Sequence, residues 1–101
     1  MMSDRLFTDL AALAALCRRH QIHRLSLFGS VLKGTARPDS DVDLLVEFEP
    51  GASPGLLGLA AIEVALSELL GGRRVDLRTA RELSRHFREE VERTAEVQFA
   101  A

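Results

Sequence analysis

The chain has 101 residues and a formal net charge of −2, and 47% of its residues are hydrophobic while 28% are charged. This length fits one compact domain, residues 1–101, with a modest hydrophobic core. The negative charge argues against binding nucleic acid through its phosphates, so no direct sequence-specific nucleic-acid contact is expected, and no apolar run reaches the roughly 18 residues of a membrane span.

The first half of the chain indicates a helix followed by a strand. Apolar side chains recur there at steps of four, three and four residues: Leu6, Leu10, Leu13 and Cys17. This spacing is typical of one face of an amphipathic helix. The segment HRLSLFG, residues 23–29, alternates in polarity and predicts a strand that ends at Gly29. A short helix over about residues 30–33 and a loop containing Pro38 follow.

The middle of the chain indicates a second strand and a longer helix. The segment DVDLLVEFEP, residues 41–50, predicts the strand, and Ser53 followed by Pro54 predicts the start of the helix. The apolar stripe of this helix comprises four residues: Leu59, Ile62, Leu66 and Leu69. Gly71 and Gly72 are expected to end it.

The last third indicates one more strand and one more helix. The segment RRVDLRT, residues 73–79, predicts a short strand, and Thr79 with Glu82 fits a capping box at the start of the final helix. The apolar stripe of that helix comprises three residues: Leu83, Phe87 and Val91. The tail, residues 97–101, indicates no single element.

The predicted order is therefore helix, strand, helix, strand, helix, strand, helix. Helices that alternate with short strands imply an α/β (α+β) domain with a small mixed sheet, covered by helices mainly on one face. The N-terminus lacks the layout of a signal peptide, and one cysteine cannot form an internal disulfide, so we expect a cytoplasmic protein without membrane contact.

Two carboxylates stand inside the second predicted strand, where apolar residues would be expected. Side chains two residues apart on a strand point to the same face, about 6.6 Å apart, so Asp41 and Asp43 share one face while Val42 and Leu44 point into the core. Neighbouring carboxylates repel each other and resist burial, and a divalent cation removes both penalties. Mg²⁺ is typically bound by one or two carboxylates together with the phosphates of a substrate.

A glycine and a serine, Gly29 and Ser30, lie where the first strand turns into a predicted helix N-terminus. Backbone N–H groups at such a turn can cradle a phosphate, and glycine lets the phosphate come close. The Ser30 hydroxyl can add another donor.

Asp76 repeats the pattern of an acid within a short apolar strand. If the third strand pairs beside the second, Asp76 joins the face of the first two acids, and three carboxylates with two metal ions would make a phosphoryl or nucleotidyl transfer site. Alternatively, Asp76 could form a structural ion pair with Arg73 or Arg74.

The spacing of these motifs resembles a known signature. Gly29-Ser30, then ten residues, then Asp41-Val42-Asp43 is similar to the pattern of the DNA polymerase beta-like nucleotidyltransferase superfamily. The short chain resembles its minimal nucleotidyltransferase (MNT) branch, which includes the MntA-type antitoxins of HEPN/MNT toxin–antitoxin systems. The resemblance extends over LSLFGS, RPDSDVDLLVEFEPG and LLGGRRVDL.

This resemblance implies a nucleotidyltransferase fold and a role for each matching residue. Gly29 and Ser30 would hold the triphosphate of ATP, with Lys33 adding a positive charge nearby. Three acids would bind two Mg²⁺ ions: Asp41, Asp43 and Asp76. Asp76 would also help to deprotonate the attacking hydroxyl. Many relatives have a basic residue directly after the Gly-Ser pair, where this chain has Val31.

The implied function is that of an ATP- and Mg²⁺-dependent protein adenylyltransferase. It would transfer AMP onto a tyrosine of a HEPN-domain ribonuclease toxin and so act as the antitoxin, in a hetero-oligomer with the toxin. Two alternatives stay open at this point. One is a non-catalytic antitoxin that neutralises the toxin by binding, and the other is a nucleotidyltransferase for a small hydroxylated substrate.

Overall fold

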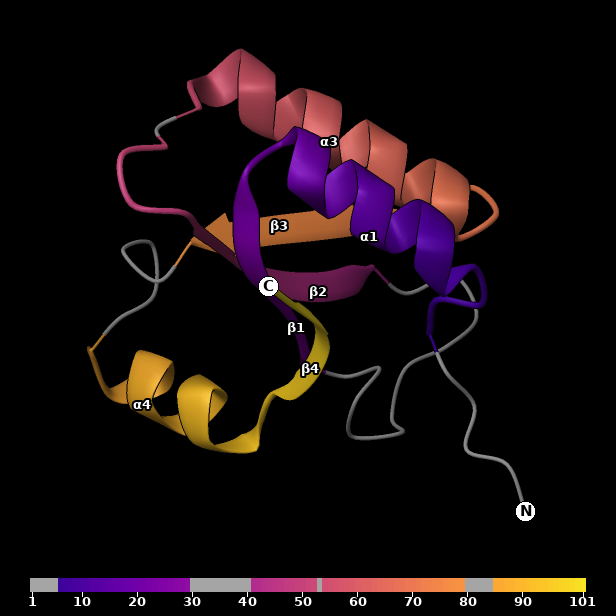
Figure 1. Cartoon of the computed structure of the whole chain (residues 1–101). Coiled ribbons are helices and arrows are strands. Elements are labelled where there is room, and N and C mark those ends of the chain that lie inside the picture. The colour runs from indigo at the N-terminus through magenta and orange to yellow at the C-terminus, as the bar shows by residue number, and fades with distance from the viewer. Residues whose placement is uncertain (1–5, 30–40, 53, 80–84) are drawn as a thin grey trace.

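The computed structural model describes residues 6–29, 41–52, 54–79 and 85–101. Along the chain these residues form the elements labelled in Figure 1: α1 (Leu10–Arg19), β1 (Ile22–Phe28), β2 (Val42–Phe48), α3 (Leu56–Leu69), β3 (Val75–Thr79), α4 (Arg85–Thr94) and β4 (Glu96–Ala100). The described helices and strands follow the predicted order, except that a fourth strand, β4, is added after α4. The short helix predicted over about residues 30–33 lies outside the described residues.

The strands form one mixed sheet in the order β3-β2-β1-β4. β1 runs antiparallel to both of its neighbours, whereas β2 and β3 are parallel, with Val42 opposite Val75 and Val46 opposite Thr79. β4 is formed by the tail to which the sequence pattern assigned no element. It pairs along β1, with Arg24 opposite Ala100, because the outer edge of β1 offers unpaired backbone groups there.

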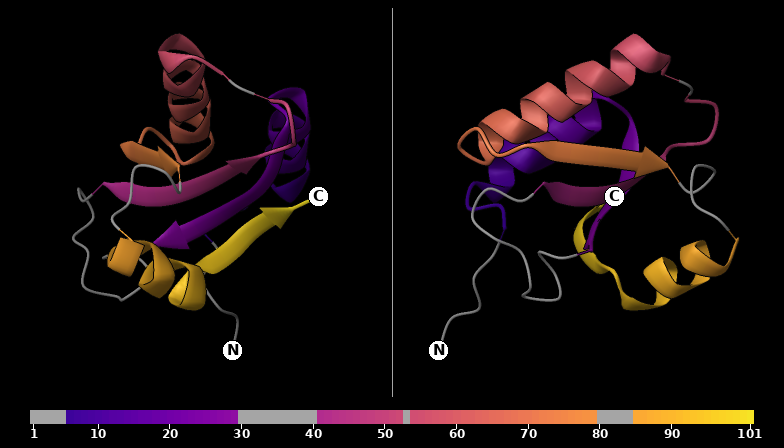
Figure 2. Two further views of the ribbon diagram at one scale, coloured as in Figure 1. Left: turned by 90° about the vertical axis from the view of Figure 1, so that its left-hand side faces the viewer. Right: turned by 180° about the vertical axis from the view of Figure 1, so that it is seen from behind.

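Helices cover both faces of the sheet, but unequally (Figure 2). α1 and α3 lie together on one face, and the main core between them and the sheet contains fully buried residues from each layer, including Leu13, Val42, Leu44, Ile62 and Leu66. α4 lies on the other face, where Val91 packs against Phe28 and Leu45 in a smaller cluster. The prediction of helices mainly on one face is therefore confirmed for two of the three described helices.

The first helix begins later than its apolar spacing suggested. The Asp9 side chain accepts a hydrogen bond from the backbone N–H of Ala12 at 3.0 Å, so Asp9 caps a helix whose first residue is Leu10. Leu6 lies before the helix and Leu10 is 46% exposed, so neither belongs to its buried stripe. The buried face is formed instead by Leu13, Leu16 and Cys17.

The start of α3 also differs from prediction. α3 begins at Leu56 with Gly55 as its N-cap and without a side-chain capping bond, so the predicted start at Pro54 is wrong. The predicted capping box of Thr79 and Glu82 at the start of the final helix falls on residues 80–84, which lie outside the described residues. The predicted buried positions Ile62, Leu66 and Val91 are confirmed. Within the described ranges, no helix combines the length and apolar character needed to cross a membrane.

Candidate active site

The predicted acids meet where three strands come together. Asp43 lies opposite Phe28 of β1 and opposite Asp76 of β3, and Asp41 stands just before β2 begins. The topology explains this meeting: β1 ends where the antiparallel β2 begins, and β3 starts beside β2 in the same direction. Residues far apart in the sequence are thus brought together at the beginning of β2.

The alternation of β2 separates core residues from site residues as predicted. Val42 and Leu44 are fully buried in the main core beneath α1 and α3. Asp43 points to the opposite face and stays partly exposed, while Leu45, which shares that face, packs beneath α4. The candidate site therefore lies on the face of the sheet away from α1 and α3.

The backbone of Gly29 lies directly against the Asp43 side chain. A Cβ atom at Gly29 would overlap Asp43 Oδ2 and would lie 3.1 Å from Asp43 Cγ and 3.2 Å from its Cβ. Gly29 also has a φ of +82°, which residues with a side chain rarely adopt. Both the close approach and the backbone conformation require glycine at this position.

The carboxyl group of Asp43 resists ionisation. Its pKa is raised above the ordinary value of 3.8, first because burial disfavours the charged form and then because of the negative charges of Asp76 and Asp41. Arg78 partly offsets these effects. Because burial and neighbouring negative charges disfavour the ionised form of this carboxyl group, a cation bound beside it would stabilise that form.

Asp76 is engaged by an arginine that the sequence analysis did not single out. Arg78 Nε and Nη2 donate to Asp76 Oδ1 and Oδ2, each at 3.1 Å. The ion pair predicted as an alternative, with Arg73 or Arg74, is therefore replaced by one with Arg78. Residues two apart on a strand share a face, and Arg78 is two residues from Asp76 within β3, whereas Arg73 and Arg74 precede the strand.

Carboxylate oxygens at this site suit a hard divalent cation, but the acidic side chains are not arranged in the geometry of a metal site. Among the described residues, no group of three or more His, Cys, Asp or Glu side chains is arranged to hold a metal ion. Asp41 and Asp43 supply carboxylate oxygens of the kind that Mg²⁺ prefers, and burial, followed by the charges of Asp76 and Asp41, raises the pKa of Asp43. A cation at Asp76 would compete with Arg78 for the carboxylate oxygens, both of which accept hydrogen bonds from that arginine.

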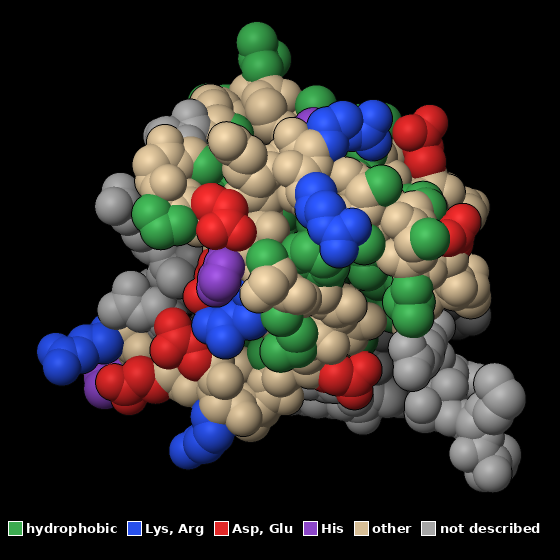
Figure 3. All heavy atoms as spheres, in the orientation of Figure 1, with side chains coloured by type: hydrophobic (Ala, Val, Ile, Leu, Met, Phe, Trp, Pro, Cys, Tyr) green, Lys and Arg blue, Asp and Glu red, His purple; other side chains and the backbone are tan. Residues whose placement is uncertain are grey.

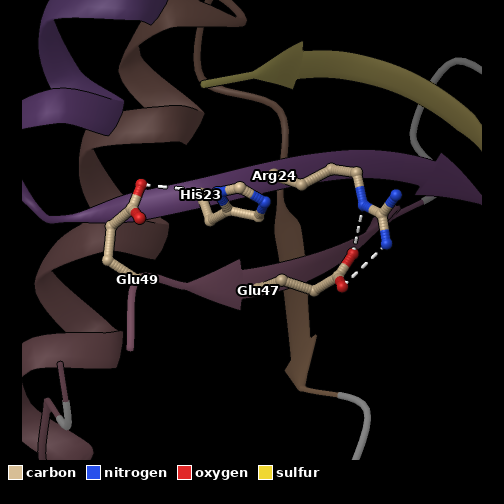
Figure 4. Close-up of polar contacts among 4 residues, drawn as sticks. All are labelled: His23, Arg24, Glu47 and Glu49. Atoms are coloured by element: carbon tan, nitrogen blue, oxygen red, sulfur yellow. Dashed lines mark hydrogen bonds and ion pairs between the residues drawn. The ribbon is translucent and has the colours of Figure 1, made fainter. Parts of the chain in front are cut away.

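Two further predicted site residues, Ser30 and Lys33, lie outside the described residues, as does Val31. Glu47 stands on the same face of β2 as Asp43 but is held by β1: Arg24 donates to its two carboxylate oxygens at 2.5 and 2.8 Å (Figure 4). His23 and Glu49 form a second contact across the same two strands at 3.4 Å. These pairs tie β1 to β2 beyond the candidate site.

A family model for the nucleotidyltransferase domain matches residues 11–98. That range includes the Gly-Ser pair, both acids at the start of β2 and Asp76. The chain belongs to this family. Its members are expected to share the fold described above, and the mixed sheet carrying Asp43 and Asp76 on neighbouring strands is the part of that fold on which the candidate site is built.

Among characterised relatives, the chain is similar to the protein adenylyltransferase MntA of Thermococcus cleftensis. The two are 45% identical over 62 residues, which is 61% of this chain and 60% of the relative. The chain thus matches less than two thirds of that protein's length.

Solved structures share the fold. A structure described as a minimal nucleotidyltransferase is 48% identical, with a TM-score of 0.69 over 85% of each chain. A toxin–antitoxin complex with AMP-PNP has a TM-score of 0.71 at 21% identity, over 92% of this chain and 74% of the other. A complex of a tri-AMPylated HEPN toxin of Shewanella oneidensis with its MNT antitoxin has a TM-score of 0.62 at 18% identity, over 91% and 70%.

Proposed function

We propose that this protein is an ATP- and Mg²⁺-dependent protein adenylyltransferase that acts in the cytoplasm as an antitoxin. It transfers AMP onto a tyrosine of a HEPN-domain toxin. The observation that carries the proposal is the paired register of Asp43 and Asp76 on parallel strands, beside the backbone of Gly29. The adenylyltransferase relative and the AMPylated toxin complex support the choice of AMP as the group transferred and of a HEPN protein as the acceptor.

Different residues of the chain would bind the metal ion and the triphosphate. Asp41 and Asp43 would hold Mg²⁺, and Asp76, now paired with Arg78, would complete the set. Bound Mg²⁺ supplies positive charge for the triphosphate and for the charge that develops during transfer. Gly29, with Ser30 and Lys33, holds the triphosphate. The positive φ of Gly29 turns the backbone where the phosphate would approach, and its missing side chain leaves the Asp43 carboxylate accessible.

The reaction requires one bond to form and one to break. The tyrosine oxygen of the acceptor attacks the α-phosphorus of ATP, and the bond from that phosphorus to the bridging oxygen of pyrophosphate breaks. The hydroxyl proton passes to a carboxylate, and we assign this role to Asp76, which is partly exposed on the face of the sheet away from α1 and α3. The products are the AMP-modified tyrosine and pyrophosphate.

One observation favours a second candidate, a non-catalytic antitoxin that acts by binding. The Asp76 carboxylate is already satisfied by the Arg78 guanidinium through two hydrogen bonds. If that pair persists when nucleotide and metal are present, the third carboxylate cannot take part in transfer, and the domain would neutralise its partner by covering it.

A single experiment separates these two functions. The purified protein is mixed with a candidate HEPN partner, ATP and Mg²⁺, and the intact mass of the partner is measured. A gain that matches one or more AMP units, lost in Asp43→Asn, is expected. Glu47→Gln serves as the matched control, because it removes an acid from the same face of the same strand without touching the site. A stable complex with no change in mass would favour the non-catalytic antitoxin.

A further inference from the structure

The outward side of α3 is apolar although it faces solvent. Leu56 and Leu57 are 86% and 88% exposed, and Val64 is 61% exposed. Ala60 and Ala61 between them are also exposed. Figure 3 shows hydrophobic side chains protruding at the top of the molecule, above the N-terminal end of α3. Large apolar side chains exposed side by side commonly mark an interaction surface.

Most of these exposed residues form one stripe along the helix, with Leu56 beside it at the N-terminal end. At about 100° per residue, Leu57, Ala61, Val64 and Glu68 fall within a sector of about 60°, opposite the buried Ile62 and Leu66. α3 has two ionisable residues, Glu63 and Glu68. Glu63 is turned to the sheet, where its Oε2 accepts a hydrogen bond from the backbone N–H of Leu77 at 2.9 Å. Glu68 is therefore the only charge of α3 on the outward stripe.

The order of residues along this stripe is complementary to itself when two copies of α3 run antiparallel. A crossing centred between Ala60 and Ala61 places Leu57 of each copy opposite Val64 of the other. Alanines at the crossing point allow the two helix axes to approach closely. The larger apolar side chains then pack on both sides of this point.

Charge selects the antiparallel direction. The N-cap of α3, Gly55, makes no side-chain capping bond, and the first turn contains no acidic residue. The N–H groups and the positive dipole end at the N-terminus of α3 therefore have no capping side chain and no carboxylate from the helix itself. The same antiparallel crossing brings Glu68 of each copy to the N-terminus of α3 in the other. A parallel pairing would instead place the two Glu68 carboxylates together, which is unfavourable.

We infer that α3 is the interface of a homodimer in which two copies pack their α3 helices antiparallel. α3 lies on the face of the sheet away from Asp43 and Asp76, so both candidate sites stay open in the dimer (Figure 2). Each helix has 14 residues and is about 21 Å long, which makes the contact small, so the dimer is expected to be weak and concentration-dependent.

The test is sedimentation equilibrium of the full chain over a wide range of concentrations. The wild type is expected to form dimers reversibly, and Leu57→Glu is expected to weaken association by at least about 30-fold, because a central side chain of the contact is replaced by a charge. Leu57 is almost fully exposed in the monomer, so this change leaves the fold intact. Val97→Glu is the matched control, since Val97 is 51% exposed on β4, far from α3, and should leave the dimer unchanged.

The direction of pairing is tested with Glu68→Gln. Antiparallel helices lose two favourable contacts with helix N-termini, so association should weaken by about 3- to 30-fold. Stronger association would indicate parallel helices and overturn the inferred arrangement. A wild type that remains monomeric, together with loss of HEPN-partner binding in Leu57→Glu, would overturn the dimer and assign the stripe to the partner. AMP transfer by Leu57→Glu is measured in parallel, so a failure of the dimer and a failure of the proposed activity can be told apart.

Discussion

Gly29 and Asp43 are in such close contact that the backbone of one determines the space available to the carboxylate of the other. A methyl group at Gly29 would overlap Asp43 Oδ2, and the carboxylate could not keep its present place beside Asp76. The turn after β1 and the acid at the start of β2 thus form one unit, and the chemistry proposed for the acid depends on the glycine.

Gly29→Ala is therefore expected to reduce AMP transfer by about 100-fold or more and to destabilise the fold by about 1–3 kcal/mol, since it combines a clash with a strained backbone. Gly51→Ala separates these causes. Gly51 has a similar φ of +86°, but a Cβ there would meet no atom within 4 Å. Gly51→Ala should lower the free energy of unfolding by about 1–2 kcal/mol without affecting AMP transfer. Equal activity losses in the two variants would show that the Asp43 contact is unimportant.

The raised pKa of Asp43 predicts how stability depends on pH without metal. The folded state binds this proton more tightly than the unfolded state does, so Asp43 contributes stability that is fully present below about pH 3.8 and is lost as the pH rises through the raised folded pKa. Ionised Asp43 consequently destabilises the fold at neutral pH. Asp43→Asn should melt at a higher temperature than wild type at pH 7 in EDTA, and the difference should disappear as the pH falls toward 3.8.

Added Mg²⁺ provides the complementary measurement. A cation that binds the folded state alone raises its melting temperature, so Mg²⁺ should stabilise the wild type and have much less effect on Asp43→Asn. The metal assignment would be wrong if Mg²⁺ raised both melting temperatures equally.

Arg78→Gln is expected to strengthen metal binding while changing stability little. The side chains of Asp76 and Arg78 are partly exposed, at 34% and 45%, so solvent screens the pair and its loss should cost less than about 1 kcal/mol. Asp76 would then be free to coordinate, and Mn²⁺ affinity, measured by electron paramagnetic resonance without nucleotide, should rise several-fold. Arg24→Gln breaks the comparable pair with Glu47 and should leave Mn²⁺ affinity unchanged. Weaker Mn²⁺ binding by Arg78→Gln would mean that Arg78 supports the site rather than competing for Asp76.

Cys17 is expected to be unreactive in the folded protein. It is fully buried in the main core, and burial raises the pKa of its thiol to about 11. Iodoacetamide at pH 8 should modify it no faster than the protein unfolds, as followed by intact mass. The same reagent in denaturant should modify it completely, which serves as the control. Rapid labelling under native conditions would mean that α1 opens readily from the sheet.

The sequence by itself determined the features that depend on local periodicity. Alternation along residues 42–48 separates the buried Val42 and Leu44 from Asp43, because side chains on a strand point in turn to opposite faces. Gly29 was predicted as a site residue from its place in the sequence, directly after a predicted strand and before the acidic pair. These features need no knowledge of which strands become neighbours.

Only the tertiary structure decided which of these features meet. The pairing of β3 beside β2 brings Asp76 opposite Asp43, and the order of strands depends on packing between residues far apart in the chain. The same packing gives the tail a place as β4 against β1 and puts α4 on the face opposite α1 and α3. The partner of Asp76 is Arg78, which lies within β3 on the same face, rather than Arg73 or Arg74, which precede the strand.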